Sequence, residues 1–452
     1  MNNTKSLIAA VVLGTFIGVL TVYETIGIIS MVISVIGIMI CYRYPLLMSI
    51  ALPFAIFLWS PLASFGGFNV TWLDAILGLF YLHLVIYSRE YLKKYHGCLA
   101  SRHSFQLLIL VWAPILFSIL GAILYFGVDK AINSLLYIKR WCAYSILPVG
   151  MLMFCSKKDL KYVYIALAIA NLLYFASTVL GIAVMGELSE FDKDRAAGLV
   201  FNPNVAGCVA VVLINVCLEM SSRESVRWLR VLWFCGIFMN LTILVSTGSR
   251  EALIGLVVTG MMWTIIQGRK IWRYIPLVLV GVSLFLVMLS FSDVSNAMFK
   301  RVGEVFQLGS KEENVSTRLE AQKIGLGMLA QYPLGIGVGN INPVSCDFMF
   351  DREFTSRYVS VFSSGIGTSD NQFIDGIVEN GILGELVFVA GLYWIYRVSL
   401  WTKARDMQVN LVMLSVVGMA GYTFYSPFIA SLLWLILACR LVEAQVKEDS
   451  QA

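Results

Sequence analysis

The sequence predicts an all-α, polytopic membrane protein, and three observations support this fold class. Of the 452 residues, 59% are hydrophobic and only 13% are charged, whereas soluble proteins average about 25% charged residues. Apolar runs of about 18 to 20 residues recur along most of the chain, and a helix needs this length to cross a bilayer. These runs lack the two-residue alternation of transmembrane barrel strands. The composition therefore excludes an ordinary soluble enzyme and a disordered protein.

Taken in order, the apolar runs predict about 12 to 14 transmembrane helices, because one or two runs could be re-entrant or merged. They lie at 6–23, 26–42, 46–62, 70–88, 105–126, 138–154, 160–184, 200–219, 229–246, 250–267, 274–291, 382–399, 407–422 and 427–442. The first run lacks a small-residue cleavage site, so it is expected to be a helix rather than a removable signal peptide. The chain thus divides into N-terminal helices over 1–184, central helices over 185–291, a large loop over 292–372, and C-terminal helices with a short tail over 373–452.

The charges between the runs predict the orientation of the chain in the membrane. Lysine and arginine are concentrated in every second gap, and such gaps face the cytoplasm in membrane proteins. These gaps contain Arg43, Arg89, Lys93, Lys94, Arg102, Lys157, Lys158, Lys161, Arg223, Arg227, Arg230, Arg269, Lys270, Arg273, Arg397, Lys403 and Arg405. Both termini are then expected to be cytoplasmic. The net charge of +5 reflects orientation, and no nucleic-acid partner is expected.

One gap differs from the others in length. The residues between 293 and 368 are polar enough to leave the membrane, and the alternation of the gaps puts them on the outer side. Long loops in compact proteins are usually functional. The spans themselves hold few charges, and the exceptions Asp74, Glu219 and Glu385 are expected near span ends. The sequence therefore predicts a helical platform that carries a partly helical outer loop.

Arg250 follows a turn that is expected to start a helix on the outer side. Ser246 to Ser249 can form the turn and the N-cap, which leaves free N–H groups and a positive dipole end beside the arginine. Such a helix start is suited to binding an anion. The alternative is that Arg250 only reaches the membrane interface or pairs with Glu251.

Arg318 is expected at a second helix start within the large loop. Thr317 and Glu320 have the spacing of a capping box, and the helix should stop at Pro333. Arg318 could then bind the same anion as Arg250, or it could belong to a solvated surface helix. The string GIGVGN at 335–340 lacks the spacing of a nucleotide-binding loop and is interpreted as a flexible turn.

Asp370 is the candidate base of the outer side. Ser369 or Asp370 could cap the helix that becomes the next span, which would place the carboxylate at the membrane surface beside Asn371. The alternative is a capping aspartate without a chemical role.

Four stretches together resemble the superfamily of O-antigen polymerases and O-antigen ligases. They are Arg195 with GLVFNPN, the turn STGSREAL, STRLEAQ continuing to QYPLGIGVGN, and DNQFIDGIVENGILG. Each string is weakly specific, but their order, the chain length and the late outer loop make a more specific combination. The resemblance covers roughly residues 190 to 400.

The resemblance implies a membrane glycosyltransferase of the bacterial inner membrane with its active site on the periplasmic face. It implies a glycan donor on undecaprenyl diphosphate, no metal and no cofactor, with a chain-length regulator and a flippase as possible pathway partners. By the same resemblance, Arg250 and Arg318 hold the diphosphate, Arg195 could assist them, and Asp370 acts on the acceptor. Further substrate contacts are assigned to Asn204, Asn371 and Glu379.

Asp370 bears on which reaction is expected. Ligases of this superfamily carry a histidine before the asparagine in the last stretch, whereas this chain has Asp370 there. This difference favours a polymerase, which extends a lipid-linked repeat unit, over a ligase, which transfers the finished glycan to lipid A core. A capsule or exopolysaccharide polymerase is a third reading. A lipid-linked oligosaccharide flippase or an anion transporter is the alternative from another class, but a transporter would be expected to place polar groups inside its spans.

Overall fold

A computed structural model describes the fold over most of the chain. The described residues are 37, 39–57, 61–65, 68–94, 99–136, 141–179, 202–268, 313–351, 369, 371–419, 421, 423–424 and 426–449. The predicted span at 6–23, most of the one at 26–42, and the one at 274–291 lie outside these ranges.

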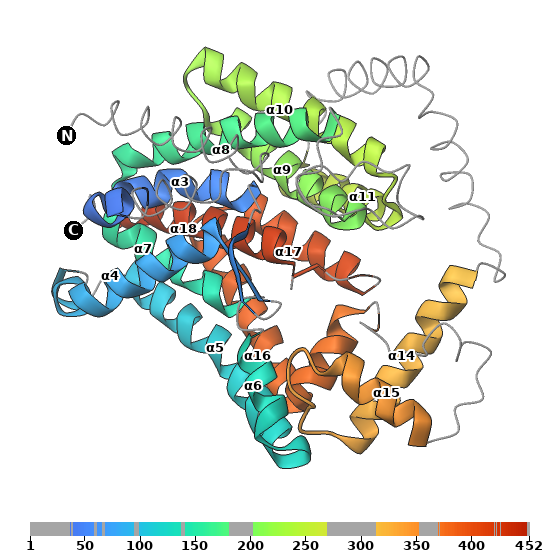
Figure 1. Cartoon of the computed structure of the whole chain (residues 1–452). Coiled ribbons are helices and arrows are strands. Elements are labelled where there is room, and N and C mark those ends of the chain that lie inside the picture. Colours follow the sequence, from blue (N-terminus) through green and yellow to red (C-terminus); the bar gives the residue numbers. More distant parts are fainter. Residues whose placement is uncertain are drawn as a thin grey trace.

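Helices dominate the described residues, as the sequence predicts (Figure 1). They are α3 Pro45–Phe57, α4 Trp72–Lys94, α5 Leu99–Phe126, α6 Val128–Leu136, the short 3-10 helix η2 Cys142–Ser145, α7 Ile146–Phe154, α8 Lys157–Val179, α9 Pro203–Arg223, α10 Arg227–Thr247, α11 Arg250–Gln267, α14 Glu313–Gln331, α15 Ile341–Asp351, α16 Gln372–Trp401, α17 Arg405–Gly418 and α18 Pro427–Asp449.

Five of the described helices are long and apolar enough to cross a membrane. They are α5 from Arg102 to Phe126, α8, α9, α10, and α18 as far as Gln445. Each coincides with a predicted span. Other predicted spans within the described ranges also form helices, but several are short, such as α3 with 13 residues. The fold is therefore that of an all-α, multi-pass membrane protein.

A β-hairpin follows α3, and the sequence analysis missed it. The predicted span at 46–62 ends as a helix at Phe57, and strands β1 (Pro61–Phe65) and β2 (Phe68–Thr71) then pair antiparallel. Two glycines, residues 66 and 67, separate the strands in the sequence, and a Gly-Gly pair is a known signal for a tight hairpin. The apolar residues of β1 concealed this signal because they prolong the hydropathy of α3.

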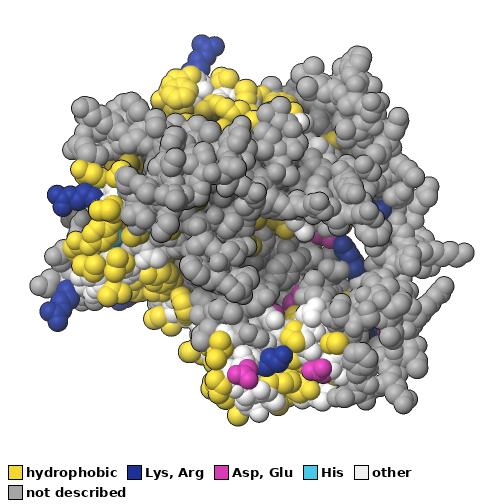
Figure 2. Space-filling view, in the orientation of Figure 1, with side chains coloured by type: hydrophobic (Ala, Val, Ile, Leu, Met, Phe, Trp, Pro, Cys, Tyr) yellow, Lys and Arg dark blue, Asp and Glu magenta, His cyan; other side chains and the backbone are white. Residues whose placement is uncertain are grey.

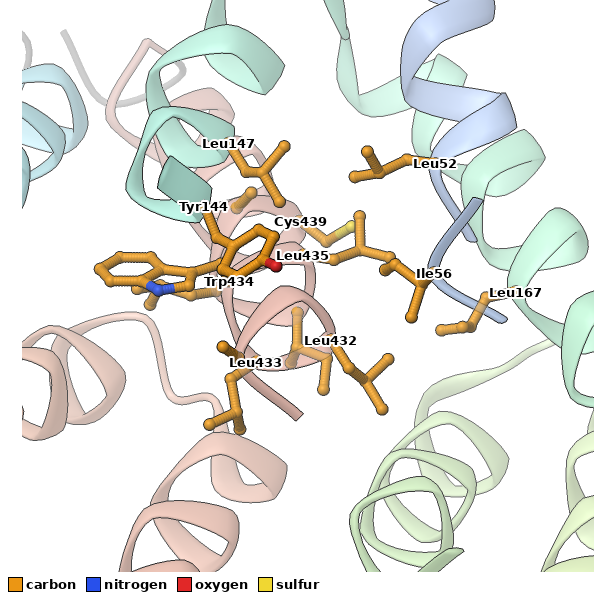
Figure 3. Packing of buried hydrophobic residues seen from close by; sticks show 14 of the residues in the cluster. Leu52, Ile56, Tyr144, Leu147, Leu167, Leu432, Leu433, Trp434, Leu435 and Cys439 are labelled. Atoms are coloured by element: carbon orange, nitrogen blue, oxygen red, sulfur yellow. The ribbon is translucent and has the colours of Figure 1, made fainter. Parts of the chain in front are cut away.

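The main hydrophobic core surrounds α18, which lies in the middle of the bundle (Figure 1). This helix packs against α3, α7, α8 and α9, and its apolar residues are almost all buried. Figure 3 shows Leu432 to Leu435 and Cys439 of α18 among side chains from α3, α7 and α8. Trp434 contacts Trp141 with ring centroids 5.2 Å apart. The C-terminal helix thus holds the N-terminal helices together.

A second, smaller core lies within the large loop and the first half of α16. It consists of Ala321, Ile324, Met328, Ile336, Ile341, Val344, Phe348 and Val378. Helices α14 and α15 lie beside α16 at one end of the molecule (Figure 1). The prediction that the large loop is partly helical is therefore confirmed, and the structure adds that its helices share a core with α16.

The string 335–340 is packed rather than a flexible turn. Ile336 N–H donates to Val378 O at 2.9 Å, and Gly337 N–H donates to Glu379 O at 3.0 Å. Gly335 has a φ of 92° and touches the backbone of α16 at Gly381, where α16 is kinked with φ 72° and ψ 171°. Both glycines are required, since a side chain at either would collide with backbone. The 335–340 string therefore packs tightly against the kink of α16 at Gly381.

The structure also shows where charged side chains are buried. Glu385 lies four residues after the kink at Gly381 in α16, and its side chain is buried. Arg440 of α18 and Asp406 of α17 form a buried ion pair at 2.6 Å. A buried charge is tolerated when an opposite charge pairs with it. Helices α17 and α18 thus bury a charged pair where they meet.

Candidate functional site

Arg250 is the first residue of α11, as predicted. The Ser249 side chain accepts a hydrogen bond from Ala252 N–H at 3.3 Å, so Ser249 is the N-cap. The preceding helix α10 ends at Thr247, and its C-cap Gly248 has the left-handed φ of 57° that favours glycine. The turn and the cap are therefore confirmed, and Arg250 lies at the positive end of the α11 dipole.

The start of α9 lies close to the start of α11. Asn202 caps α9 by accepting hydrogen bonds from Asn204 N–H at 2.9 Å and Val205 N–H at 3.1 Å. One turn further on, Gly207 packs so closely on the α10–α11 turn that a Cβ there would lie 3.0 Å from the Cβ of Ser249. Two helix N-termini are thus neighbours, and Asn204 belongs to the first turn of one of them.

Arg318 contacts the residue that follows Arg250. Its Nη1 lies 2.8 Å from Oε1 of Glu251, across 67 residues of sequence. The predicted capping box is wrong, because α14 begins at Glu313 and Thr317 lies inside it. The polar residues before Thr317 extend α14 back to Glu313, so the threonine does not lie at the N-terminus of the helix. Arg318 therefore projects from the second turn of α14 toward the start of α11.

The start of α16 is capped by Asn371, not by Ser369 or Asp370 as expected. The Asn371 Oδ1 accepts hydrogen bonds from Phe373 N–H at 3.1 Å and Ile374 N–H at 3.2 Å. Asparagine is as good an N-cap as aspartate, so sequence alone did not separate the candidates. The predicted site residues Asp370 and Arg195 lie outside the described residues.

A short segment before α18 connects the starts of α16 and α11. The Gln372 side chain accepts hydrogen bonds from the N–H groups of Thr423 at 3.0 Å and Phe424 at 2.5 Å. Gly421 lies against Glu251, since a Cβ on it would be 2.5 Å from Oε2 of that carboxylate. The N-termini of α9, α11 and α16 therefore belong to one region, which we call the arginine site together with Arg318.

The face of α14 that carries Arg318 also meets the start of α16. Gly325 lies seven residues after Arg318 and hence on the same helix face. A Cβ on Gly325 would be 3.0 Å from Ile374 and 3.5 Å from Ser369. Two helical turns cover about 10 Å along the axis. The residues on either side of Asp370 in the sequence, Ser369 and Asn371, thus lie at the end of α16 that faces α14.

Figure 2 shows basic and acidic side chains in the region between the upper helices and the α14–α15 region. Charges of both signs in one place can hold a charged ligand and polarise it.

Glu379, a predicted substrate contact, has a structural partner. Its side chain is buried, and its Oε1 accepts a hydrogen bond from Gly339 N–H at 2.8 Å. This contact fixes the 335–340 loop against α16. Sequence reasoning identified the residue but not this partner.

Two further residues of the arginine site were missed. Glu251 was considered only as a partner of Arg250, because a sequence shows neighbours in the chain and not contacts across 67 residues. Gln372 had no distinguishing signal beyond its place after Asn371. An acidic residue in the first turn of a helix is favoured by the helix dipole, and this was the available hint for Glu251.

Comparison with known proteins supports the same region. The family described as O-antigen ligase matches residues 235–390. This segment runs from α10 to the middle of α16 and contains Arg250, Glu251, Arg318 and Asn371. No curated protein gives a significant match to the chain. Residues 235–390 are therefore similar to a family whose members are membrane glycosyltransferase-like enzymes, and this supports the resemblance to O-antigen ligases and polymerases.

Proposed function

We propose that this protein is an O-antigen or related surface-polysaccharide polymerase. It would transfer a growing glycan from undecaprenyl diphosphate to the sugar end of another lipid-linked repeat unit. The observation that carries the proposal is the contact of Arg318 with Glu251, because it puts Arg318 beside the start of α11, where Arg250 is the first residue.

The donor side of the reaction needs positive charge. When the bond between the anomeric carbon and the diphosphate oxygen breaks, its electron pair goes to the diphosphate, which gains negative charge. Guanidinium groups bind such oxygens through charge-assisted hydrogen bonds, and helix N-termini add N–H donors. Arg250 and Arg318 are assigned this role, with Arg195 as a third candidate and Asn204 at the neighbouring helix start.

The acceptor side needs a base. The hydroxyl oxygen of the acceptor sugar forms the new bond to the anomeric carbon, and its proton passes to a carboxylate. Asp370 is assigned this role, and in-line attack predicts inversion at the anomeric carbon. Its neighbour Asn371 holds the α16 start through its side chain. No metal and no cofactor is part of this proposal.

The ligase remains the second candidate, because the matched family is described as O-antigen ligase. Asp370 in place of the ligase histidine favours the polymerase. The composition of the surface polysaccharide in a deletion strain separates the two. A single repeat unit on the lipid core indicates a polymerase, and a bare core with accumulated lipid-linked polymer indicates a ligase.

A transporter of lipid-linked oligosaccharides or of anions is the candidate from another class. It would be expected to line a pathway inside the spans with cations, whereas the buried Arg440 is paired with Asp406. Incubating the purified protein with lipid-linked repeat units in detergent tests this point. An enzyme makes longer lipid-linked glycans without any gradient, and a transporter leaves the repeat units unchanged.

A further inference from the structure

Glu251 places a negative charge within the arginine site. It is the second residue of α11, next to Arg250, and its carboxylate pairs with Arg318 at 2.8 Å. The side chain is only 12% exposed, compared with 38% for Arg318. A carboxylate repels an anionic ligand. An acid in this place therefore calls for a role other than ligand binding.

We propose that Glu251 is a positioning residue for glycosyl transfer, an inference that rests on the proposed function. It orients the guanidinium of Arg318 and holds α14 against the start of α11. Both arginines then meet the same donor diphosphate at the moment the glycosidic bond breaks.

The geometry of the pair supports this role. Arginine presents five N–H donors in a planar fork, so fixing one terminal nitrogen restricts the directions of the others. Arg318 belongs to α14, which the large loop supplies, whereas Arg250 belongs to α11. The ion pair therefore joins α14 to α11, two helices that are distant in sequence. In the proposal, Arg318 of α14 and Arg250 of α11 bind the same diphosphate at this place.

Glu251 is itself held in position. The N-terminus of α11 stabilises an anion in its first turn, and Gly421 leaves room for the carboxylate by having no side chain. The carboxylate also offsets the repulsion between two arginines brought close together. Holding α14 and Arg318 in place before the donor arrives lowers the cost of ordering them in the transition state.

The test is the kinetics of Glu251→Gln in the full-length protein with lipid-linked repeat units as substrate. Glutamine keeps the shape but removes the charge, so kcat should fall by about tenfold or more while the KM for the donor changes less. Glu251→Asp keeps the charge and should recover part of the loss. The matched control is Lys323→Gln, which breaks the exposed pair of Lys323 with Glu320 on the same helix α14 and should leave kcat unchanged.

A double-mutant cycle separates positioning from simple stabilisation. If Glu251 acts through Arg318, the double variant Glu251→Gln with Arg318→Gln should be no slower than Arg318→Gln alone. Melting temperatures of all variants in detergent identify any loss of folding, and Glu251→Asp carries the test if Glu251→Gln does not fold. Independent, additive losses would contradict the proposal, as would an unchanged or increased kcat in Glu251→Gln.

The outcomes also separate this inference from the proposed function. If Arg318→Ala loses activity while Glu251→Gln is fully active, the diphosphate role stands and the positioning role is refuted. If the wild-type protein leaves the repeat units unchanged, the proposed function fails and this inference fails with it.

Discussion

In the proposed reaction, Arg250 and Arg318 bind the diphosphate of the donor. Each charge-assisted contact to the diphosphate should be worth roughly 1.5 to 3 kcal/mol. Replacing either arginine with alanine should therefore lower activity by about ten- to a hundredfold or more. Lysine should rescue poorly because it lacks the planar fork. Polymer formation by purified variants measures the effect.

The control for this prediction is again Lys323→Gln, since Lys323 is a cation on α14 whose side chain is 70% exposed. Surface pairs of this kind contribute little. Full activity in both alanine variants would remove the diphosphate role.

In the proposed reaction, Asp370 is the base that accepts the proton of the acceptor hydroxyl. Asp370→Asn keeps the size of the side chain and deletes its ability to accept a proton, so turnover should fall strongly while donor binding and folding persist. Turnover and donor affinity are measured separately. Because Asn371 and not Asp370 caps α16, the substitution should leave the helix start intact. Near-normal polymer synthesis by Asp370→Asn would mean that positioning and the arginines suffice.

At the scale of elements, the 335–340 string of the large loop packs against the helix bundle at the kink in α16. Gly381 has a positive φ and touches the backbone of Leu334 and Gly335. Gly381→Ala should destabilise the fold by about 1 to 3 kcal/mol from the backbone conformation alone, with a further cost from the collision. Gly391→Ala is the matched control on the same helix, because a Cβ there meets nothing within 4 Å.

Thermal unfolding in detergent compares the two alanine variants. The melting temperature of Gly381→Ala should fall, and that of Gly391→Ala should stay near the wild-type value or rise. Equal melting temperatures for the two variants would show that the loop does not depend on the kink.

The ion pair of Asp406 with Arg440 joins α17 to α18. Asp406→Asn leaves a buried arginine with one fewer counter-charge, and breaking such a pair costs about 3 to 5 kcal/mol. The double variant Asp406→Leu with Arg440→Met removes both charges and should be more stable than Asp406→Asn alone. Melting temperatures of the two variants test this order of stability. A double variant less stable than Asp406→Asn would contradict the prediction.

At the scale of the whole molecule, the basic gaps between the apolar runs predict the orientation of the chain in the membrane. The alternation of basic gaps predicts that a reporter fused within 300–315 acts as periplasmic and that one fused within 94–100 acts as cytoplasmic. Paired fusions of a reporter active on only one side measure this directly. The opposite pair of results would invert the topology and place the arginine site on the cytoplasmic side.

Local patterns predicted much of this fold, and contacts between distant segments could not be predicted. Hydropathy located α5, α8, α9, α10 and α18, and turn chemistry located the start of α11, because these signals depend on neighbours in the chain. The pairing of Arg318 with Glu251 and the packing of 335–340 into the α16 kink depend on tertiary structure. The N-cap of α16 was misassigned because the side chains of three adjacent residues could each serve as the N-cap.

The synthesis of polymer by the purified protein tests the central claim most directly. Wild-type protein incubated with lipid-linked repeat units in detergent should produce a ladder of lipid-linked glycans, and Arg318→Ala should produce it at least about tenfold more slowly. A ladder that is unchanged in Arg318→Ala, or repeat units left unextended by the wild-type protein, would contradict the proposal that the arginine site carries out glycosyl transfer.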